Sequence, residues 1–286
     1  MNNYVIAAIA VFSLTFCGCD KLTNPVITLD NEYLEGVYGP PPEFETLADP
    51  TKNVLVEEFT GHLCGFCPPA TALLKGLDEE YGSRVVPITI HAGTLAAVSA
   101  APYDIDFTTP AGNLFWSQLE NGFNPAARID RTGGISNFYV DNQWEVRVEE
   151  QLTQEPRIAL QISTEYVSED SNLNIHVHNH FLETMSSSFS LIVLLLESHI
   201  ISAQSDYNLD PSTIYDYEHN HLLRTNVTTA IGEPLLTNPL VNDQLVKSYT
   251  VPMKQAWVPE NCSVVAFVVD VQTDEVVNAA EHRIEL

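Results

Sequence analysis

The chain has 286 residues, of which 45% are hydrophobic, so it is long enough for two domains that each bury a core. Its formal net charge of -26 would repel nucleic-acid phosphates and anionic lipid head groups, which excludes nucleic acid as a partner. Only 17% of the residues are charged and apolar runs are frequent, so we expect an acidic globular protein and not a disordered acidic tail.

The chain begins with an uncharged apolar block over residues 4–16, followed directly by Cys17, Gly18 and Cys19. This block is too short to span a bilayer. It resembles a bacterial lipoprotein signal, in which the cysteine after the cleavage site carries the lipid. The small Gly18 favours Cys19 over Cys17 as that cysteine, although the block lacks the usual basic start, and a buried apolar segment is the alternative. We predict a signal peptide over residues 1–18 and a lipid anchor at Cys19.

Residues 19–48 are predicted to form a tether and a lead-in strand. They contain turn formers, and the run Gly39–Pro42 keeps the backbone extended. The first clear strand follows over residues 54–59, bounded by Thr60 and Gly61. This strand leads directly into a Cys-x-x-Cys motif.

Cys64 and Cys67 stand at the junction of that strand with a helix that we expect from Pro68 to Gly82. A thiol at the amino end of a helix faces free N–H groups and the positive end of the helix dipole, which favour its thiolate. Cys64 would therefore attack a disulfide, and Cys67 would resolve the mixed disulfide. A static disulfide is the alternative. A zinc site, in which His62 and His91 would join the two thiols as ligands, is a further alternative, but the spacing suits zinc poorly.

The elements that follow the helix alternate with strands and indicate parallel pairing of the first two strands. Residues 92–107 are irregular and read as an insertion. The sequence predicts a strand over 85–91, a helix opening at Pro110, a short strand after Pro125, a second short strand over 137–140 and a helix over 144–152.

This order of elements, with a proline before the hairpin, resembles the thioredoxin fold. The resemblance implies that Asn124-Pro125 is a cis bond, and that Pro125 packs against the cysteine pair and receives the backbone of the substrate. It also implies a buried acid six residues before Cys64, where Glu58 stands. Leu63 departs from the family, which usually carries Trp before the first cysteine.

Glu57 and Glu58 are neighbours on the predicted strand and should face opposite sides of it, so only one of them can be buried. The spacing to Cys64 favours Glu58. Burial would raise the pKa of its carboxyl, which could then exchange a proton with Cys67. The alternative is that Glu58 is an exposed member of an acidic pair.

Three segments are more specific still: Glu57 to Pro68, Asp130-Arg131, and Tyr217 to Arg224. They resemble the Omp28-related outer-membrane lipoproteins of Bacteroidota, and the likeness spans nearly the whole mature chain. The resemblance implies a thioredoxin-like domain joined to a β-sandwich, and a location in the cell envelope facing the periplasm or the cell surface.

The second half carries several strand-like runs rich in Val, Ile, Leu and Phe, separated by Asn, Asp, Ser and Pro. These runs are 157–167, 173–180, 189–197, 246–251 and 263–271. We therefore predict an α/β thioredoxin-like domain over residues 49–155 and an all-β immunoglobulin-like sandwich over residues 156–286. Cys262 adjoins one of these runs and is expected to be a packed, inert thiol.

His176, His178 and His180 alternate along one predicted strand and share a face, with His219 and His221 in a similar arrangement elsewhere. Such a set could bind a transition metal. The alternative, which we favour, is a solvated strand face. We predict no bound cofactor.

The sequence as a whole predicts a lipid-anchored envelope protein that performs thiol-disulfide exchange on exported proteins. The site residues are Cys64, Cys67, Glu58 and Pro125. The alternative is a non-catalytic surface-binding or adhesion lipoprotein, in which the disulfide is structural and the partner is an unknown surface molecule.

Overall fold

The structure is a computed structural model that describes residues 31–286. The predicted signal peptide and the predicted anchor Cys19 lie outside the described residues. None of the helices within residues 31–286 is long and apolar enough to cross a membrane.

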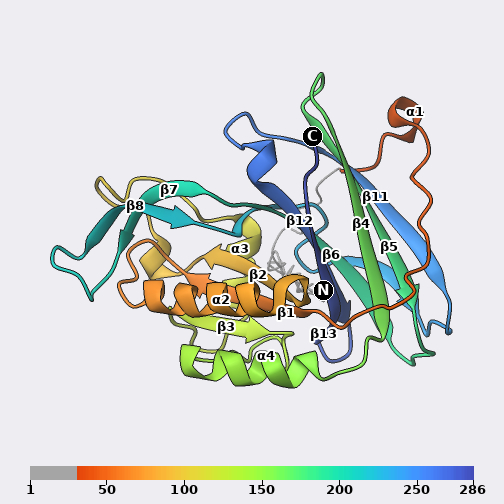
Figure 1. Cartoon of the computed structure of the whole chain (residues 1–286), viewed down its shortest axis with the longest axis horizontal. Coiled ribbons are helices and arrows are strands. Elements are labelled where there is room, and N and C mark those ends of the chain that lie inside the picture. Colours follow the sequence, from red (N-terminus) through yellow and green to blue (C-terminus); the bar gives the residue numbers. More distant parts are fainter. Residues whose placement is uncertain (1–30) are drawn as a thin grey trace, which may run out of the picture.

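The described residues form a mixed α/β structure with many strands and few helices (Figure 1). The α-helices are α1 (Glu35–Tyr38), α2 (Cys67–Tyr81), α3 (Pro110–Ser117) and α4 (Trp144–Leu152). The strands are β1 (Val54–Thr60), β2 (Val85–His91), β3 (Ala126–Ile129), β4 (Ile158–Val167), β5 (Asn172–Phe181), β6 (Ser188–Glu197), β7 (Ile200–Ser205), β8 (Thr213–His219), β9 (Leu222–Asn226), β10 (Glu233–Thr237), β11 (Gln244–Pro252), β12 (Cys262–Asp270) and β13 (Val276–Arg283).

One eight-stranded sheet runs through both halves of the chain in the order β13-β12-β6-β9-β2-β1-β3, with β10 also paired to β6. As predicted, β1 and β2 are parallel and are joined through α2, and β3 lies antiparallel to β1. The strand β9 of the second half pairs beside β2 through Leu222 and Thr89. The sheet is therefore continuous across the predicted boundary between residues 155 and 156.

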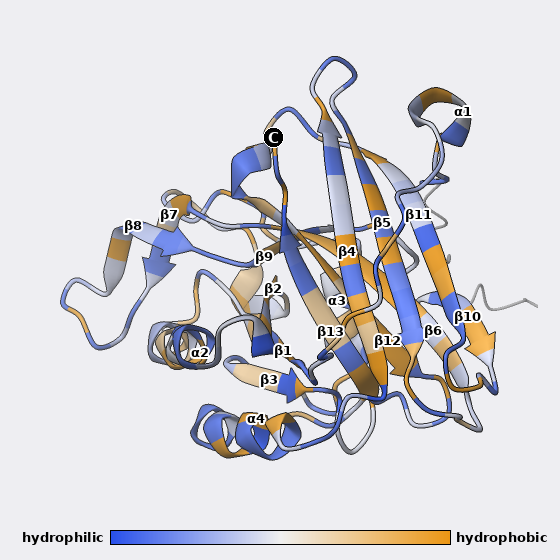
Figure 2. Cartoon of the chain, turned by 45° about the vertical axis from the view of Figure 1, so that its right-hand side comes forward, coloured by the Kyte–Doolittle hydropathy of each residue, from blue (hydrophilic) through white to orange (hydrophobic). Residues whose placement is uncertain are grey.

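Three hydrophobic cores cover the faces of this sheet. One lies between β1–β3 and the helices α2 and α4, and includes the buried Trp144. A second joins β1, β2 and α3 to β6, β12 and β13 of the other half. The third lies where the three-stranded sheet β11-β5-β4 packs on β6 and β12. Figure 2 shows hydrophobic stretches on the strands of both sheets and hydrophilic residues along the outer sides of α2 and α4.

The expectation that only one of Glu57 and Glu58 is buried is wrong. Both side chains are fully buried. The reason is that β1 lies inside the sheet with a covered core on each face, so alternation along the strand moves a side chain from one core to the other. Each carboxyl must then find its own partners.

The prediction of a second short strand over residues 137–140 is also wrong. Only a single bridge forms there, between Tyr139 and Ala127. Pairing ends at this point because the chain enters a 3-10 turn over Asp141–Gln143 and then α4, and the ring N–H of Trp144 donates to the carbonyl oxygen of Tyr139 at 2.9 Å. This contact connects the loop to the start of the helix.

The amino-terminal segment from residue 31 to residue 45 lies along the three-stranded sheet, on the side where α1 is seen in Figure 1. Glu32 forms a bridge with Tyr249 of β11, and the N–H of Thr250 donates to the carbonyl oxygen of Asn31 at 3.1 Å. Phe44 stacks on His178 of β5 with 5.2 Å between ring centroids. This segment is therefore bound to the second half before the chain enters β1.

Candidate active site

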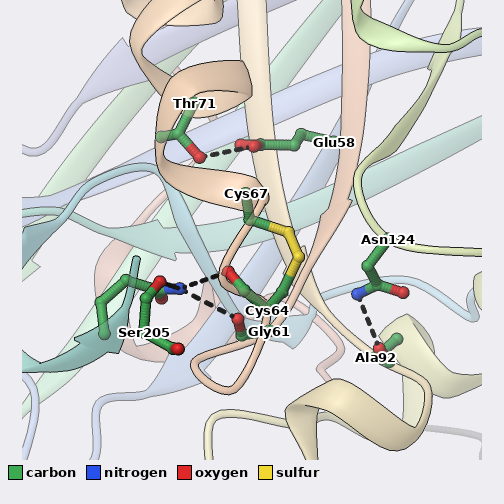
Figure 3. The surroundings of a disulfide bond; sticks show 9 residues. Glu58, Gly61, Cys64, Cys67, Thr71, Ala92, Asn124 and Ser205 are labelled. Atoms are coloured by element: carbon green, nitrogen blue, oxygen red, sulfur yellow. Dashed lines mark hydrogen bonds between the residues drawn. A yellow bond between two sulfur atoms is a disulfide. The ribbon is translucent and has the colours of Figure 1, made fainter. Parts of the chain in front are cut away.

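The candidate site lies at the carboxyl end of β1, where Cys64 and Cys67 form a disulfide (Figure 3). The helix α2 starts at Cys67, so the disulfide closes the turn at its amino end. The N–H of Cys64 donates to the carbonyl oxygen of Gly61 at 2.9 Å and the N–H of Cys67 to that of Cys64 at 3.1 Å. Each cysteine is only 1% exposed.

The β7–β8 hairpin of the second half covers this turn. The side-chain amide of Gln204 donates to the carbonyl oxygens of Gly61 and Cys64 at 3.2 and 3.1 Å (Figure 3). The N–H of Ser205 donates to the carbonyl oxygen of His62 at 2.8 Å. The hairpin therefore supplies hydrogen-bond donors to the backbone carbonyl oxygens of the disulfide turn, which would otherwise bond to water.

Tyr207, in the loop that follows β7, continues this cover. Its N–H donates to the carbonyl oxygen of Gly65 at 2.9 Å, and its ring meets that of Phe66 edge-on at 5.0 Å. A Cβ at Gly65 would lie 2.3 Å from the Tyr207 ring, so only glycine allows this approach.

Gly65→Ala is therefore expected to displace the Tyr207 ring and to increase the rate at which a small phosphine reduces the disulfide at pH 7.5 by several-fold. Gly76→Ala is the matched control, because it adds a methyl group in α2 where nothing lies within 4 Å. Equal reduction rates in the two variants and the wild type would show that Tyr207 does not limit access to the disulfide.

Glu58 lies on β1 behind the first turn of α2, and its burial agrees with the prediction. The hydroxyl of Thr71 donates to its carboxylate at 2.6 Å (Figure 3), and that of Thr89 donates at 3.4 Å. Burial raises the pKa of Glu58 to about 7, and the two hydroxyl groups offset only part of this shift. The carboxyl can therefore gain or lose a proton near neutral pH.

A cavity of about 200 Å³ reaches Glu58 between α2, β2 and the ends of β8 and β9. Its lining also includes the charged or titratable side chains of Lys75, Asp78, Glu218 and His221. Nothing in the sequence indicates this cavity, since its walls come from six separate segments.

The bond between Asn124 and Pro125 is cis, as the resemblance implied. Pro125 directly precedes β3, whose residue Ala126 pairs with Phe59 near the carboxyl end of β1. The side-chain amide of Asn124 donates to the carbonyl oxygen of Ala92 at 3.2 Å (Figure 3). The proline therefore lies at the same end of the sheet as the disulfide.

Glu57 has a different environment, which the sequence did not reveal. Arg128 and Arg131 each donate to its carboxylate at 2.7 Å, and Arg131 makes a second bond at 2.9 Å. Burial alone would raise the pKa of Glu57, but the two guanidinium groups outweigh burial and lower it. Burial also lowers the pKa of Arg128 to about 10.

Three histidines from distant segments meet beside the disulfide turn: His62, His91 at the end of β2 and His219 at the end of β8. The ring centroids of His62 and His91 are 6.1 Å apart, and those of His91 and His219 are 5.3 Å apart. All three are buried. Both ring nitrogens of His91 and Nε2 of His219 lack a hydrogen-bond partner. Burial lowers the pKa of His219 to about 4 and that of His91 well below its ordinary value.

The face of β5 that carries His176, His178 and His180 is not solvated, so that expectation is wrong. All three side chains are buried, and the amino-terminal segment covers two of them, with Tyr33 against His176 and Phe44 against His178. Their hydrogen-bond partners are Ser248 for His176, Gln161 and Gln244 for His178, and Asn242 for His180. Throughout residues 31–286, no three His, Cys, Asp or Glu side chains are grouped so that they could hold a metal ion.

Cys262, at the start of β12, is a free and buried thiol. Burial raises its pKa to about 12, which keeps it protonated and unreactive. This agrees with the expected inert thiol.

The family described as outer membrane protein Omp28 matches residues 116–285, which is more than half of the chain. The chain belongs to the Omp28 family. The protein is accordingly located at the outer membrane. The match begins after Cys67, so family membership carries no information about the disulfide. A comparison with curated protein sequences finds no significant match.

Solved structures similar to this Omp28-family protein include two of comparable extent. HBP35 of Porphyromonas gingivalis is 15% identical, with 82% of this chain and 76% of that chain covered and a TM-score of 0.62. Protein AGR_C_4864 from Agrobacterium tumefaciens is 12% identical, with 84% and 99% covered and a TM-score of 0.50. A domain of the outer membrane lipoprotein Omp28 from Porphyromonas gingivalis is 25% identical, with 45% and 88% covered and a TM-score of 0.31. At these identities the first two show a likeness in fold alone.

Proposed function

We propose that the protein performs thiol-disulfide exchange on exported proteins, through a thioredoxin-like first half. The observation that carries this proposal is the position of the Cys64–Cys67 disulfide at the amino end of α2, with the buried carboxyl of Glu58 behind it. A disulfide in this place leaves Cys64 as the thiol stabilised by the helix end once the bond is reduced.

The exchange starts when a thiolate of a protein substrate attacks Sγ of Cys64. The Cys64–Cys67 bond breaks, a mixed disulfide forms between substrate and Cys64, and Cys67 leaves as a thiolate that takes up a proton. A second substrate thiolate then attacks the substrate sulfur and releases Cys64. The substrate dithiol has lost two electrons and the Cys64–Cys67 pair has gained them. The reverse sequence reduces a substrate disulfide, with Cys64 attacking and Cys67 resolving.

Glu58 supplies and recovers the proton of Cys67 in this proposal. Its pKa of about 7 suits a group that must both hold and release a proton near neutral pH. Thr71 lies on the first turns of α2 and orients the carboxyl. The cavity that reaches Glu58 is lined by polar side chains and is large enough for water, which gives the carboxyl a route to the solvent.

The remaining parts of the chain position the exchange site. Pro125 would receive the backbone of the substrate, and a lipid on Cys19 would hold the protein at the membrane. The second half would form an immunoglobulin-like sandwich, in which the three-stranded sheet packs on β6 and β12.

One observation favours a second candidate function. The disulfide is buried beneath the β7–β8 hairpin, whereas a redox site must admit its substrate. The second candidate is therefore a protein that binds a surface partner without catalysis and in which the disulfide is structural.

The two candidates are separated by measuring the reduction potential of the pair and the rate of insulin reduction by the purified protein. Exchange predicts a potential well above about −300 mV and activity that is lost in Cys64→Ser. Cys262→Ala is the control and should keep the wild-type rate, because its thiol is buried in the other core. A potential below about −300 mV without activity would establish the structural disulfide.

A further inference from the structure

The β7–β8 hairpin is joined to the rest of the molecule through narrow connections. Its two strands pair with each other in a sheet of their own, which projects from the body in Figure 1. His199 precedes β7 and His221 follows β8, and both have left-handed backbone conformations with φ of 60° and 51°. These two residues flank the hairpin at its base, where a hinge would have to lie.

The inner side of the hairpin carries His219 into the body of the protein. The His219 ring lies 5.1 Å from that of Phe107 and 5.3 Å from that of His91. In the closed arrangement, both ring nitrogens of His91 are buried without a partner. The hairpin therefore encloses two imidazoles among largely aromatic side chains, where a proton would be poorly solvated.

The charged or titratable groups around these two imidazoles come from several elements. His62 comes from the disulfide turn and Tyr103 from the loop after β2, with their rings 5.6 Å apart. The ring of Tyr217 on β8 lies 4.9 Å from that of His219. Burial raises the pKa of Tyr217, and the nearby charges of Glu58 and Asp206 raise it further. The groups that act on His91 and His219 themselves are histidines, which disfavour protonation.

We propose that the β7–β8 hairpin is a hinged cover over the Cys64–Cys67 disulfide, and that it opens when His91 and His219 take up protons. The proposal rests on the proposed exchange function, since it names how access to that site is controlled. In the closed state the disulfide turn is held by hydrogen bonds from Gln204, Ser205 and Tyr207 to its backbone carbonyl oxygens. A substrate thiol can reach Cys64 only after these contacts separate.

The direction of the pH effect follows from linkage. Burial in the closed state lowers the pKa of His219 to about 4, whereas exposure in the open state restores it toward 6.5. The open state therefore binds more protons between pH 6.5 and pH 4, and the closed state loses stability as the pH falls through this range. His219 changes the closed-to-open ratio by up to about tenfold per pH unit there, and His91, whose pKa burial also lowers, acts in the same direction.

The test measures how fast a small phosphine reduces the disulfide of the whole protein between pH 7.5 and pH 5, relative to a small disulfide under the same conditions. The wild-type ratio should rise at least about tenfold as the pH falls. In His91→Phe/His219→Phe, which keeps the aromatic packing but cannot be protonated, the rise should fall below about twofold. His178→Gln is the control, because burial also lowers the pKa of that histidine, but it lies on β5. A flat wild-type profile, or the same rise in the double variant, would overturn the proposal.

Hydrogen exchange of the wild type provides a second measurement that needs no variant. The amide groups of Ser205 and Tyr207, which donate to the disulfide turn, should lose protection below pH 6 while those of β12 keep theirs. Joint loss in both places would mean global unfolding and would contradict a hinged cover. Neither measurement depends on catalysis, so a cover that fails to open and a disulfide pair that fails to exchange are distinguished.

Discussion

Glu57→Gln is expected to lower the free energy of unfolding by about 3–5 kcal/mol at pH 7. The substitution removes the only carboxylate charge in direct contact with two buried guanidinium groups, those of Arg128 and Arg131, within the described residues. A buried charge without its partner costs far more than a lost surface pair, because the interior cannot solvate it. Urea unfolding of the wild type and the variant measures the difference.

Glu79→Gln is the control for this experiment. Glu79 pairs with Lys75 on α2, but its side chain is 68% exposed, so the change should cost less than about 1 kcal/mol. Because the guanidinium groups lower the pKa of Glu57, its stabilisation should be present at neutral pH and lost as the pH falls through that lowered pKa. A loss below about 1 kcal/mol at pH 7 would show that the three groups are not buried together.

The substitution Glu58→Gln, at the neighbouring residue, should raise the free energy of unfolding. Burial raises the pKa of Glu58 from 4.5 to about 7, so the folded protein holds a proton that the unfolded chain releases between these values. The stability of the wild type therefore falls as the pH rises from 4.5 to 7. Glutamine is never charged, so the variant should be more stable than the wild type by about 3 kcal/mol at pH 8.

The same urea experiment at pH 4 is the internal control for Glu58→Gln. Both glutamate and glutamine are then neutral in the folded state, so the two proteins should differ by less than about 1 kcal/mol. If the wild type and Glu58→Gln were equally stable at pH 8 as well as at pH 4, the carboxyl of Glu58 would not be held in a neutral form by burial. In the proposed exchange mechanism the stabilised variant is also slower, since Cys67 loses its proton carrier.

The part of the fold that depends on short-range pattern could be predicted from the sequence. The strand before Cys64, the helix after it and the parallel strand β2 follow from hydrophobic period, Pro and Gly positions. The burial of Glu58 followed from its spacing to Cys64, although alternation along the strand wrongly implied that Glu57 would then be exposed. The reason is that β1 lies inside the sheet with a core on each face, and the place of a strand in a sheet depends on distant segments of the chain.

The parts that could not be predicted depend on contacts between distant segments. The five strand runs recognised in the second half did not include β7, β8 or β9, which are short and carry polar residues. As a result, neither the cover over the disulfide nor the pairing of β9 with β2 was expected. His62 and His91 were considered as possible neighbours of the two thiols, but His219 lies far from both in the sequence and only the fold brings it beside them.

In the proposed lipid-anchored protein, the attachment of the amino-terminal segment along the three-stranded sheet limits the length of the tether to the membrane. From a lipid on Cys19 to Asn31, which contacts β11, the chain is about 12 residues long and spans at most about 40 Å when fully extended. In Figure 1 the segment around α1 lies at one end of the long axis and the β7–β8 hairpin at the other. In the proposed anchored protein, the tether would therefore join the described part of the chain at the opposite end of its long axis from the covered disulfide.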